Sequence, residues 1–137
     1  TLLAGQAYIR FEPRGQYIGT EPYSKWTKPS CVLIGEDNYS DASGFPYVYK
    51  TLGIGKLIGA PVPGTMTAVW WETQIDPSIV FGIPQVGSVG TKEGRYLENM
   101  QVEPDILIYN DPASVLRGED KQLEAAVKEM LKTIDNK

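Results

Sequence analysis

Two short apolar runs constrain the fold of this chain more than any other feature. Residues 31–34 read Cys-Val-Leu-Ile and residues 56–59 read Lys-Leu-Ile-Gly, without the alternation of a half-exposed strand. Such runs are typical of strands buried on both faces of a parallel sheet. Between them, Ala42 to Leu52 has a helical pattern that Gly53 can end. A strand, a helix and a strand in this order predict a right-handed βαβ unit, with 31–34 as a central strand.

A polar turn follows the first run and brings one serine to the start of the predicted helix. Residues 35–41 read Gly-Glu-Asp-Asn-Tyr-Ser-Asp. Sites in parallel sheets usually lie at the carboxyl ends of the strands. A helix N-terminus also offers unpaired N–H groups and a partial positive charge, which stabilise the oxyanion formed when a serine attacks a carbonyl. Ser40 is therefore a candidate nucleophile, although Ser and Asp are equally common as helix caps.

The composition limits the chemistry that is available to this serine. The 137 residues include no histidine, which is the usual base for a catalytic serine. The single cysteine, Cys31, cannot form an intrachain disulfide, and we expect it to be a buried, inert thiol. With no histidine and only scattered carboxylates, we expect no metal site and no cofactor.

The size and charge of the chain are those of one soluble globular domain, with 42% hydrophobic and 22% charged residues. The net charge of −4 is spread along the chain, and Lys and Arg do not cluster, so neither nucleic acid nor an anionic membrane is an expected partner. No apolar run approaches the roughly 18 residues of a membrane span. Because the chain begins at Thr1 without a methionine, we expect it to be a piece of a longer protein.

A β-hairpin is predicted in the second half of the chain. Residues 67–73 and 79–83 are rich in β-branched and aromatic side chains, and they flank an Asp-Pro-Ser turn at 76–78. Trp70 and Trp71 must face opposite sides of their strand. We expect one of them to pack in the core and the other to line a groove or to contact another domain.

The other elements follow from shorter signals. We predict a strand at 8–11, a polar loop at 20–29, a strand that carries Glu98, and a short helix capped by Asp111. The last helix has an apolar stripe, which we expect to pack on the core or on a neighbouring domain. Its residues are Leu123, Ala126, Val127, Met130, Leu131 and Ile134.

Two blocks of sequence resemble a known family. Residues 38–59 contain Asn-Tyr-Ser-Asp-Ala, Phe-Pro-Tyr and Leu-Gly-Ile-Gly-Lys-Leu-Ile-Gly, and they resemble the serine turn of tricorn proteases and of the related C-terminal-processing serine peptidases. Residues 96–106, with Tyr-Leu-Glu-Asn and Val-Glu-Pro-Asp-Ile, resemble the segment that closes the same catalytic domain. The resemblance implies an α/β, crotonase-like fold with a parallel βαβ core, an added β-hairpin and a C-terminal helix. Residues 1–137 would then be the C-terminal part of a tricorn-like catalytic domain.

The same resemblance implies roles for three residues. Ser40 would be the nucleophile, the backbone N–H of Asp41 an oxyanion donor, and Glu98 the group that orients the Ser–His pair. The processing peptidases use a lysine base, but Thr65 stands at that position here and cannot act as a base. Tricorn-like enzymes use a histidine, with a supporting serine, from another part of the polypeptide. We therefore expect peptide hydrolysis through an acyl-enzyme, with upstream domains that supply the histidine and an oxyanion glycine, and a fragment that is nearly inert alone.

Two alternatives remain open from the sequence. The chain could be a non-catalytic binding or assembly module, in which the βαβ unit is only a scaffold. It could also belong to a lysine-dependent processing peptidase whose base has moved to Lys50 or Lys56, although both lie far along or beyond the helix that follows Ser40. The expected partners are a peptide or protein substrate and further copies of the protein in a homo-oligomer. The compartment stays open between the cytoplasm and the bacterial cell envelope.

Overall fold

A three-stranded parallel sheet forms the centre of the computed structural model, which describes residues 5–7 and 9–135. Its strands are β3 (Cys31–Ile34), β4 (Lys56–Gly59) and β7 (Ile106–Leu107), in the order β3-β4-β7. Helix α1 (Asp41–Thr51) connects β3 to β4, which pair in parallel. The predicted α/β class and the βαβ unit are therefore confirmed, and the helix begins and ends one residue earlier than predicted.

Within the described residues, the strand at 31–34 lies at an edge of the sheet and not at its centre as predicted. β4 lies in the middle of the sheet, because β7 pairs with it on the side away from β3. Leu57 and Ile58 of β4 are fully buried, whereas Leu33 is 42% exposed. Cys31 is half-buried, not buried as predicted. Burial, with a smaller contribution from the nearby Glu129 carboxylate, raises the pKa of the thiol, so it stays protonated at neutral pH.

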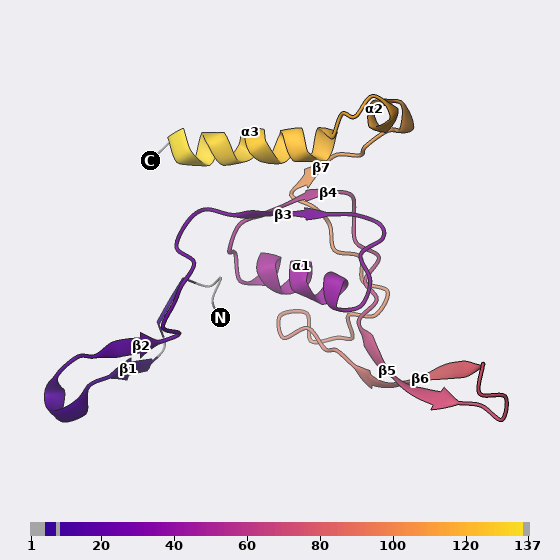
Figure 1. Ribbon diagram of the computed structural model, residues 1–137, viewed down its shortest axis with the longest axis horizontal. Coiled ribbons are helices and arrows are strands. Elements are labelled where there is room, and N and C mark those ends of the chain that lie inside the picture. The colour runs from indigo at the N-terminus through magenta and orange to yellow at the C-terminus, as the bar shows by residue number, and fades with distance from the viewer. Residues whose placement is uncertain (1–4, 8, 136–137) are drawn as a thin grey trace.

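Helices cover the two faces of the sheet. Figure 1 shows α1 on one face and α3 (Lys121–Asp135) on the other. The Tyr49 hydroxyl of α1 is hydrogen-bonded to Ser30 Oγ at 2.7 Å, just before β3 begins. The buried core between α1 and the sheet consists of Ile34, Tyr49, Leu57, Val62 and Val102.

Only one side of the predicted stripe on α3 packs against the sheet. Ala126 is buried, and α3 contacts β3 and β4. Met130 is partly buried, and the other four apolar side chains of the stripe are about half exposed: Leu123, Val127, Leu131 and Ile134. The stripe is therefore partly core and partly an open apolar face.

Two β-hairpins extend from this body (Figure 1). The first pairs β1 (Ile9–Phe11) with β2 (Gly19–Glu21), and the short 3₁₀ helix η2 (Pro13–Gly15) lies between them. β2 overlaps the start of the segment that was predicted as a loop, and Tyr8 of the predicted first strand lies outside the described residues. The second hairpin is confirmed, and it pairs β5 (Thr67–Thr73) with β6 (Val80–Gly87), which begins one residue later and ends four residues later than predicted.

The expectation that one tryptophan packs in the core is wrong. Trp70 is 61% exposed and Trp71 is 71% exposed. A two-stranded hairpin that extends from the body has no second layer to cover either face, so alternation along β5 leaves both rings accessible. Trp71 instead lies against Gly82 of the neighbouring strand, where an added Cβ would be 3.1 Å from the indole ring.

The short helix α2 (Pro112–Leu116) is capped as predicted, because the Asp111 carboxylate accepts a hydrogen bond from the Ser114 N–H at 3.0 Å. Among the helices of the described residues, none combines the length and the apolar character that a bilayer span requires. Residues 5–7 and 9–135 also contain no group of three or more His, Cys, Asp or Glu side chains arranged to hold a metal ion.

Candidate active site

The turn between β3 and α1 is held by one asparagine. Asn38 Oδ1 accepts a hydrogen bond from the Gly35 N–H at 3.1 Å, and Asn38 Nδ2 donates to the Ala42 carbonyl at 2.8 Å. The backbone N–H of Asn38 also donates to the Gly35 carbonyl at 3.2 Å. These bonds connect the end of the strand to the first turn of the helix, and they fix the position of Ser40.

Ser40 has an unusual backbone conformation and does not cap the helix with its side chain. Its φ is 54° and its ψ is −117°, a combination that costs a non-glycine residue about 1–3 kcal/mol. The residue occupies the N-cap position, but its hydroxyl makes no capping hydrogen bond. Side-chain capping therefore does not explain why a serine stands here. An exposed serine on a strained turn from strand to helix is instead typical of hydrolase nucleophiles.

The N-terminus of α1 presents an open N–H group beside this serine. The Ala42 N–H donates to the Tyr39 carbonyl at 3.0 Å, and the Ser43 N–H donates to the Ser40 carbonyl at 2.8 Å. The Asp41 N–H donates to no acceptor within the part of the chain that the structure describes. An open N–H at the positive end of a helix dipole can bind an anion or a developing negative charge.

Glu98 lies in a turn, so the prediction that a strand carries it is wrong. The Met100 N–H donates to the Leu97 carbonyl at 3.0 Å, which closes this turn around Glu98. Asn99 adopts the positive φ of 59° that asparagine tolerates better than most residues. The local sequence therefore folds back at the point where a strand was expected to continue.

The Glu98 carboxylate is held by the segment that enters β5. The Met66 N–H donates to Glu98 Oε2 at 2.7 Å. A hydrogen bond from the Thr67 side chain, together with N–H groups of Met66 and Thr67, keeps the pKa of Glu98 below its usual value. The half-buried carboxylate is therefore ionised at neutral pH and has a fixed orientation.

A close backbone contact brings the Glu98 turn to this segment. Gly64 has a φ of +82°, and the Asn99 N–H donates to its carbonyl at 2.9 Å. A Cβ at Gly64 would lie only 2.1 Å from the Met100 carbonyl oxygen. Only glycine fits this position without moving the two segments apart.

Ser40 and Glu98 line one pocket of about 420 Å³. The side chain of Asp41, the next residue, is not part of its lining. The pocket therefore combines the predicted nucleophile, the predicted carboxylate and the base of the β5–β6 hairpin. Its lining residues are Tyr39, Ser40, Thr65, Thr67, Val69, Pro84 and Glu98.

Sequence reasoning missed the roles of two threonines in this pocket. The Ser40 N–H donates to Thr65 Oγ1 at 2.9 Å, and the Thr67 side chain contributes to the lowered pKa of Glu98. The sequence identifies Thr65 only as a position where a base is absent. Its contact with Ser40 crosses 25 residues of sequence, and no local pattern indicates it.

The two lysines considered as alternative bases are engaged elsewhere. Lys50 Nζ donates to the Glu103 carbonyl at 2.6 Å and lies 3.4 Å from the Asp105 carboxylate. Lys56 forms an ion pair with Glu129 of α3. Neither lysine lines the pocket that contains Ser40.

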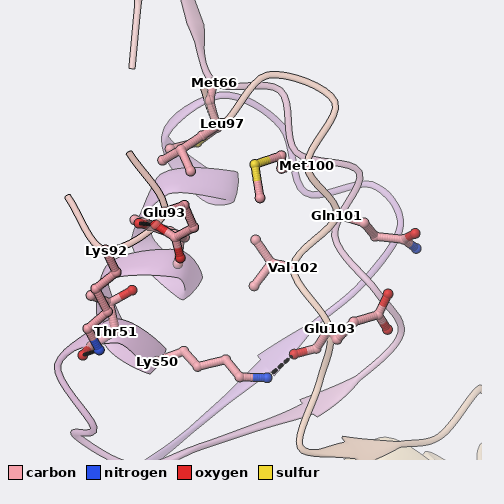
Figure 2. Close-up of a pocket in the computed structure, with 11 residues that line it drawn as sticks. Lys50, Thr51, Met66, Lys92, Glu93, Leu97, Met100, Gln101, Val102 and Glu103 are labelled. Carbon is pink, nitrogen blue, oxygen red and sulfur yellow. Dashed lines mark hydrogen bonds between the residues drawn. The ribbon is translucent and has the colours of Figure 1, made fainter. Parts of the chain in front are cut away.

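A second pocket, of about 360 Å³, lies between α1 and residues 92–103 (Figure 2). Figure 2 shows Lys50 extending along one end of it to Glu103. The Tyr47 hydroxyl donates to Glu93 at 2.6 Å, and Lys92 Nζ donates to the Thr51 carbonyl at 2.7 Å. Its apolar lining consists of Met66, Leu97, Met100 and Val102. The pocket contains neither Ser40 nor Glu98.

Comparison with known sequences gives a consistent family match. The model of peptidase family S41 matches residues 5–108. The tricorn protease of Thermoplasma acidophilum is 29% identical over 124 residues, which cover 90% of this chain and 12% of that protein. A protein of Chlamydia pneumoniae is 34% identical over 105 residues, which cover 76% of this chain and 16% of that protein. The chain thus spans only about an eighth to a sixth of the length of these relatives.

Solved structures share this fold. The crystal structure of the tricorn protease superposes with a TM-score of 0.76 at 24% identity, over 95% of this chain and 13% of that one. Mature CPAF superposes with a TM-score of 0.56 at 28% identity, over 67% of this chain and 18% of that one.

Proposed function

This chain belongs to peptidase family S41, and we propose that it carries the nucleophile of a serine peptidase that hydrolyses peptide bonds. The observation that carries the proposal is that Ser40 and Glu98 line one pocket. The strained backbone of Ser40, the open N–H of Asp41 and the ionised state of Glu98 support the same assignment.

The proposed reaction proceeds through an acyl-enzyme. Ser40 Oγ bonds to the carbonyl carbon, and its proton passes to a histidine imidazole. The Asp41 N–H donates a hydrogen bond to the oxyanion. The peptide C–N bond then breaks, and the imidazolium gives its proton to the leaving amine. Water attacks the resulting ester and releases the acid, which restores the Ser40 hydroxyl.

The histidine in this scheme comes from residues outside this chain. None of the 137 residues is a histidine, and the curated relatives are several times longer. We assign residues 1–137 to the C-terminal part of a tricorn-like catalytic domain, with the histidine and an oxyanion glycine supplied by upstream domains. The ionised Glu98 carboxylate would orient the Ser–His pair and stabilise the imidazolium. The isolated chain should then be almost inactive.

The complete protein would act on peptides or proteins as a homo-oligomer, and the complete catalytic domain would have a crotonase-like fold. The TM-score of 0.76 with the tricorn protease supports the fold assignment. The assembly is proposed by analogy with the much longer relatives and not from a surface of this chain.

Labelling with a fluorophosphonate tests the assignment, because the reagent modifies only an activated serine. The natural full-length protein is treated with the reagent, and the modified residue is mapped by mass spectrometry. We expect Ser40 to be labelled in this protein but not in the isolated 137-residue chain. Ser40→Ala should abolish the label, whereas Ser78→Ala, in the exposed turn of the β5–β6 hairpin, should leave it unchanged. A folded full-length protein that takes no label at Ser40 would refute the proposal.

A second candidate function is protein binding or assembly without catalysis. The exposed rings of Trp70 and Trp71 favour it, because accessible tryptophans on a hairpin are typical of contact surfaces. In this case Ser40 takes no label, and Trp71→Ala changes the molecular mass of the assembly in light scattering.

A further inference from the structure

We propose that Thr65 is a positioning residue that fixes the backbone of Ser40 for attack, and that Ser43 orients the Thr65 hydroxyl. The inference rests on the proposed function of Ser40. The first observation is the hydrogen bond from the Ser40 N–H to Thr65 Oγ1, at 2.9 Å. The chain thus has a neutral hydroxyl that contacts the backbone of the proposed nucleophile.

The hydrogen-bond partners determine where each hydroxyl proton lies. Thr65 Oγ1 is 3.2 Å from Ser43 Oγ, and Ser43 Oγ donates to the Asn38 carbonyl at 3.2 Å. Each hydroxyl has one proton. We assign the Ser43 proton to the Asn38 carbonyl, which can only accept, so the Thr65 proton points to Ser43 and a Thr65 lone pair accepts the Ser40 N–H. Ser43 has 0% exposure, so water does not compete at this hydroxyl.

This chain of hydrogen bonds acts on the strained residue of the turn. Ser40 has a φ of 54°, a conformation that persists only where the surroundings hold it. A fixed N–H fixes the peptide plane before Ser40, and this plane sets the direction of its Cα–Cβ bond. Thr65 thereby controls how the Ser40 hydroxyl is presented to the pocket.

The same bond separates the roles of two neighbouring N–H groups. The Ser40 N–H is occupied by Thr65, so it is not available to an oxyanion. The Asp41 N–H, without an acceptor among the described residues, remains the open donor. The N–H of the proposed nucleophile is thus structural in this protein, which is consistent with the Asp41 N–H as the oxyanion donor of the proposed reaction.

Thr65 is also next in sequence to the residue whose backbone holds the Glu98 carboxylate. The N–H of Met66, the next residue, donates to Glu98 at 2.7 Å. Consecutive residues thus contact the proposed nucleophile and the proposed orienting carboxylate. Loss of the Thr65 hydroxyl should disturb the reacting geometry more than substrate binding.

The test compares variants of the natural full-length protein. Thr65→Val removes the hydroxyl at nearly constant volume, Thr65→Ser keeps it, and Thr73→Val at the far end of β5 is the matched control. The readouts are the rate of fluorophosphonate labelling at Ser40 and the kcat and KM for a fluorogenic peptide. Misplacement by about an ångström can cost about a hundredfold in rate. We expect Thr65→Val to lower the labelling rate and kcat by about ten- to a hundredfold, with KM within about twofold.

The conservative variant and a second site keep the inference falsifiable. Thr65→Ser should recover most of the labelling rate, and Thr73→Val should not change it. If Thr65→Val does not fold, Ser43→Ala replaces it, because it removes the acceptor of the Thr65 proton and should slow labelling by about three- to tenfold. Normal labelling in a folded Thr65→Val or Ser43→Ala variant overturns the inference about Thr65 but leaves the proposed function of Ser40 in place. Absence of label in the unmodified protein overturns the proposed function and the inference with it.

Discussion

Replacement of Gly64 by alanine should loosen the contact between two segments of the candidate site. The φ of Gly64 is +82°, and the new Cβ would lie 2.1 Å from the Met100 carbonyl oxygen, where contacts under 3.0 Å are essentially never found. The segments must then separate by about an ångström, because close-packed interiors do not absorb such an overlap. The separation would weaken the 2.9 Å hydrogen bond from the Asn99 N–H to the Gly64 carbonyl.

The local stability that Gly64→Ala is expected to remove has three parts. The left-handed conformation costs alanine about 1 kcal/mol, and a lost hydrogen bond costs about 1 kcal/mol. Displaced packing adds about 1–3 kcal/mol, for a total of about 3–5 kcal/mol. Gly118→Ala is the matched control, because Gly118 has a similar φ of +76° with nothing within 4 Å of its added Cβ. Only the conformational cost of about 1 kcal/mol applies there.

Amide hydrogen exchange in the natural full-length protein measures the loss of local stability in both variants. The N–H groups of Val62 and Val102 donate to each other's carbonyl at 3.0 and 2.9 Å, and they report on Gly64→Ala. The Glu119 N–H, which donates to a carbonyl of α2 at 2.9 Å, reports on Gly118→Ala. Since about 1.4 kcal/mol is a tenfold change, exchange should rise by at least a hundredfold for the first variant and by less than tenfold for the second. Equal accelerations would refute the steric argument.

Three other predictions concern the core and the site. Leu57→Ala should cost about 2–5 kcal/mol of local stability, because the side chain is fully buried. Leu33→Ala, at a partly exposed position, should cost less than about 1 kcal/mol, and hydrogen exchange of the sheet amides compares the two variants. Tyr49→Phe should cost about 1–2 kcal/mol in the same assay, because it removes a buried hydroxyl bonded at 2.7 Å. Folding lowers the pKa of Glu98 from its unfolded value of 4.5. The stability that the ionised carboxylate contributes is therefore fully present above pH 4.5, and it is lost as the pH falls through the lower pKa of the folded protein. Protection of the Met66 amide, corrected for intrinsic exchange rates, should therefore be constant from neutral pH to about pH 4.5 and fall below it, and Glu98→Gln should remove this dependence.

Local patterns in the sequence were sufficient for the βαβ unit, the β5–β6 hairpin and the capped helix α2. Each depends on residues close together in the chain, such as the apolar runs at 31–34 and 56–59, or the carboxylate of Asp111 before Pro112. The position of Ser40 directly before α1 follows from the same kind of signal. These features could be predicted because hydrogen bonding and side-chain periodicity within one segment determine them.

The tertiary structure decided the features that depend on contacts between distant segments. The sequence by itself determined a strand at 31–34, but only the tertiary pairing order β3-β4-β7 placed that strand at an edge of the described sheet. The close approach at Gly64 and the turn at Asn99 brought Glu98 to the pocket of Ser40, and the bond from Ser40 to Thr65 crosses 25 residues. Periodicity specifies which face of a segment is buried, whereas the partner of that face is selected by the packing of the whole chain.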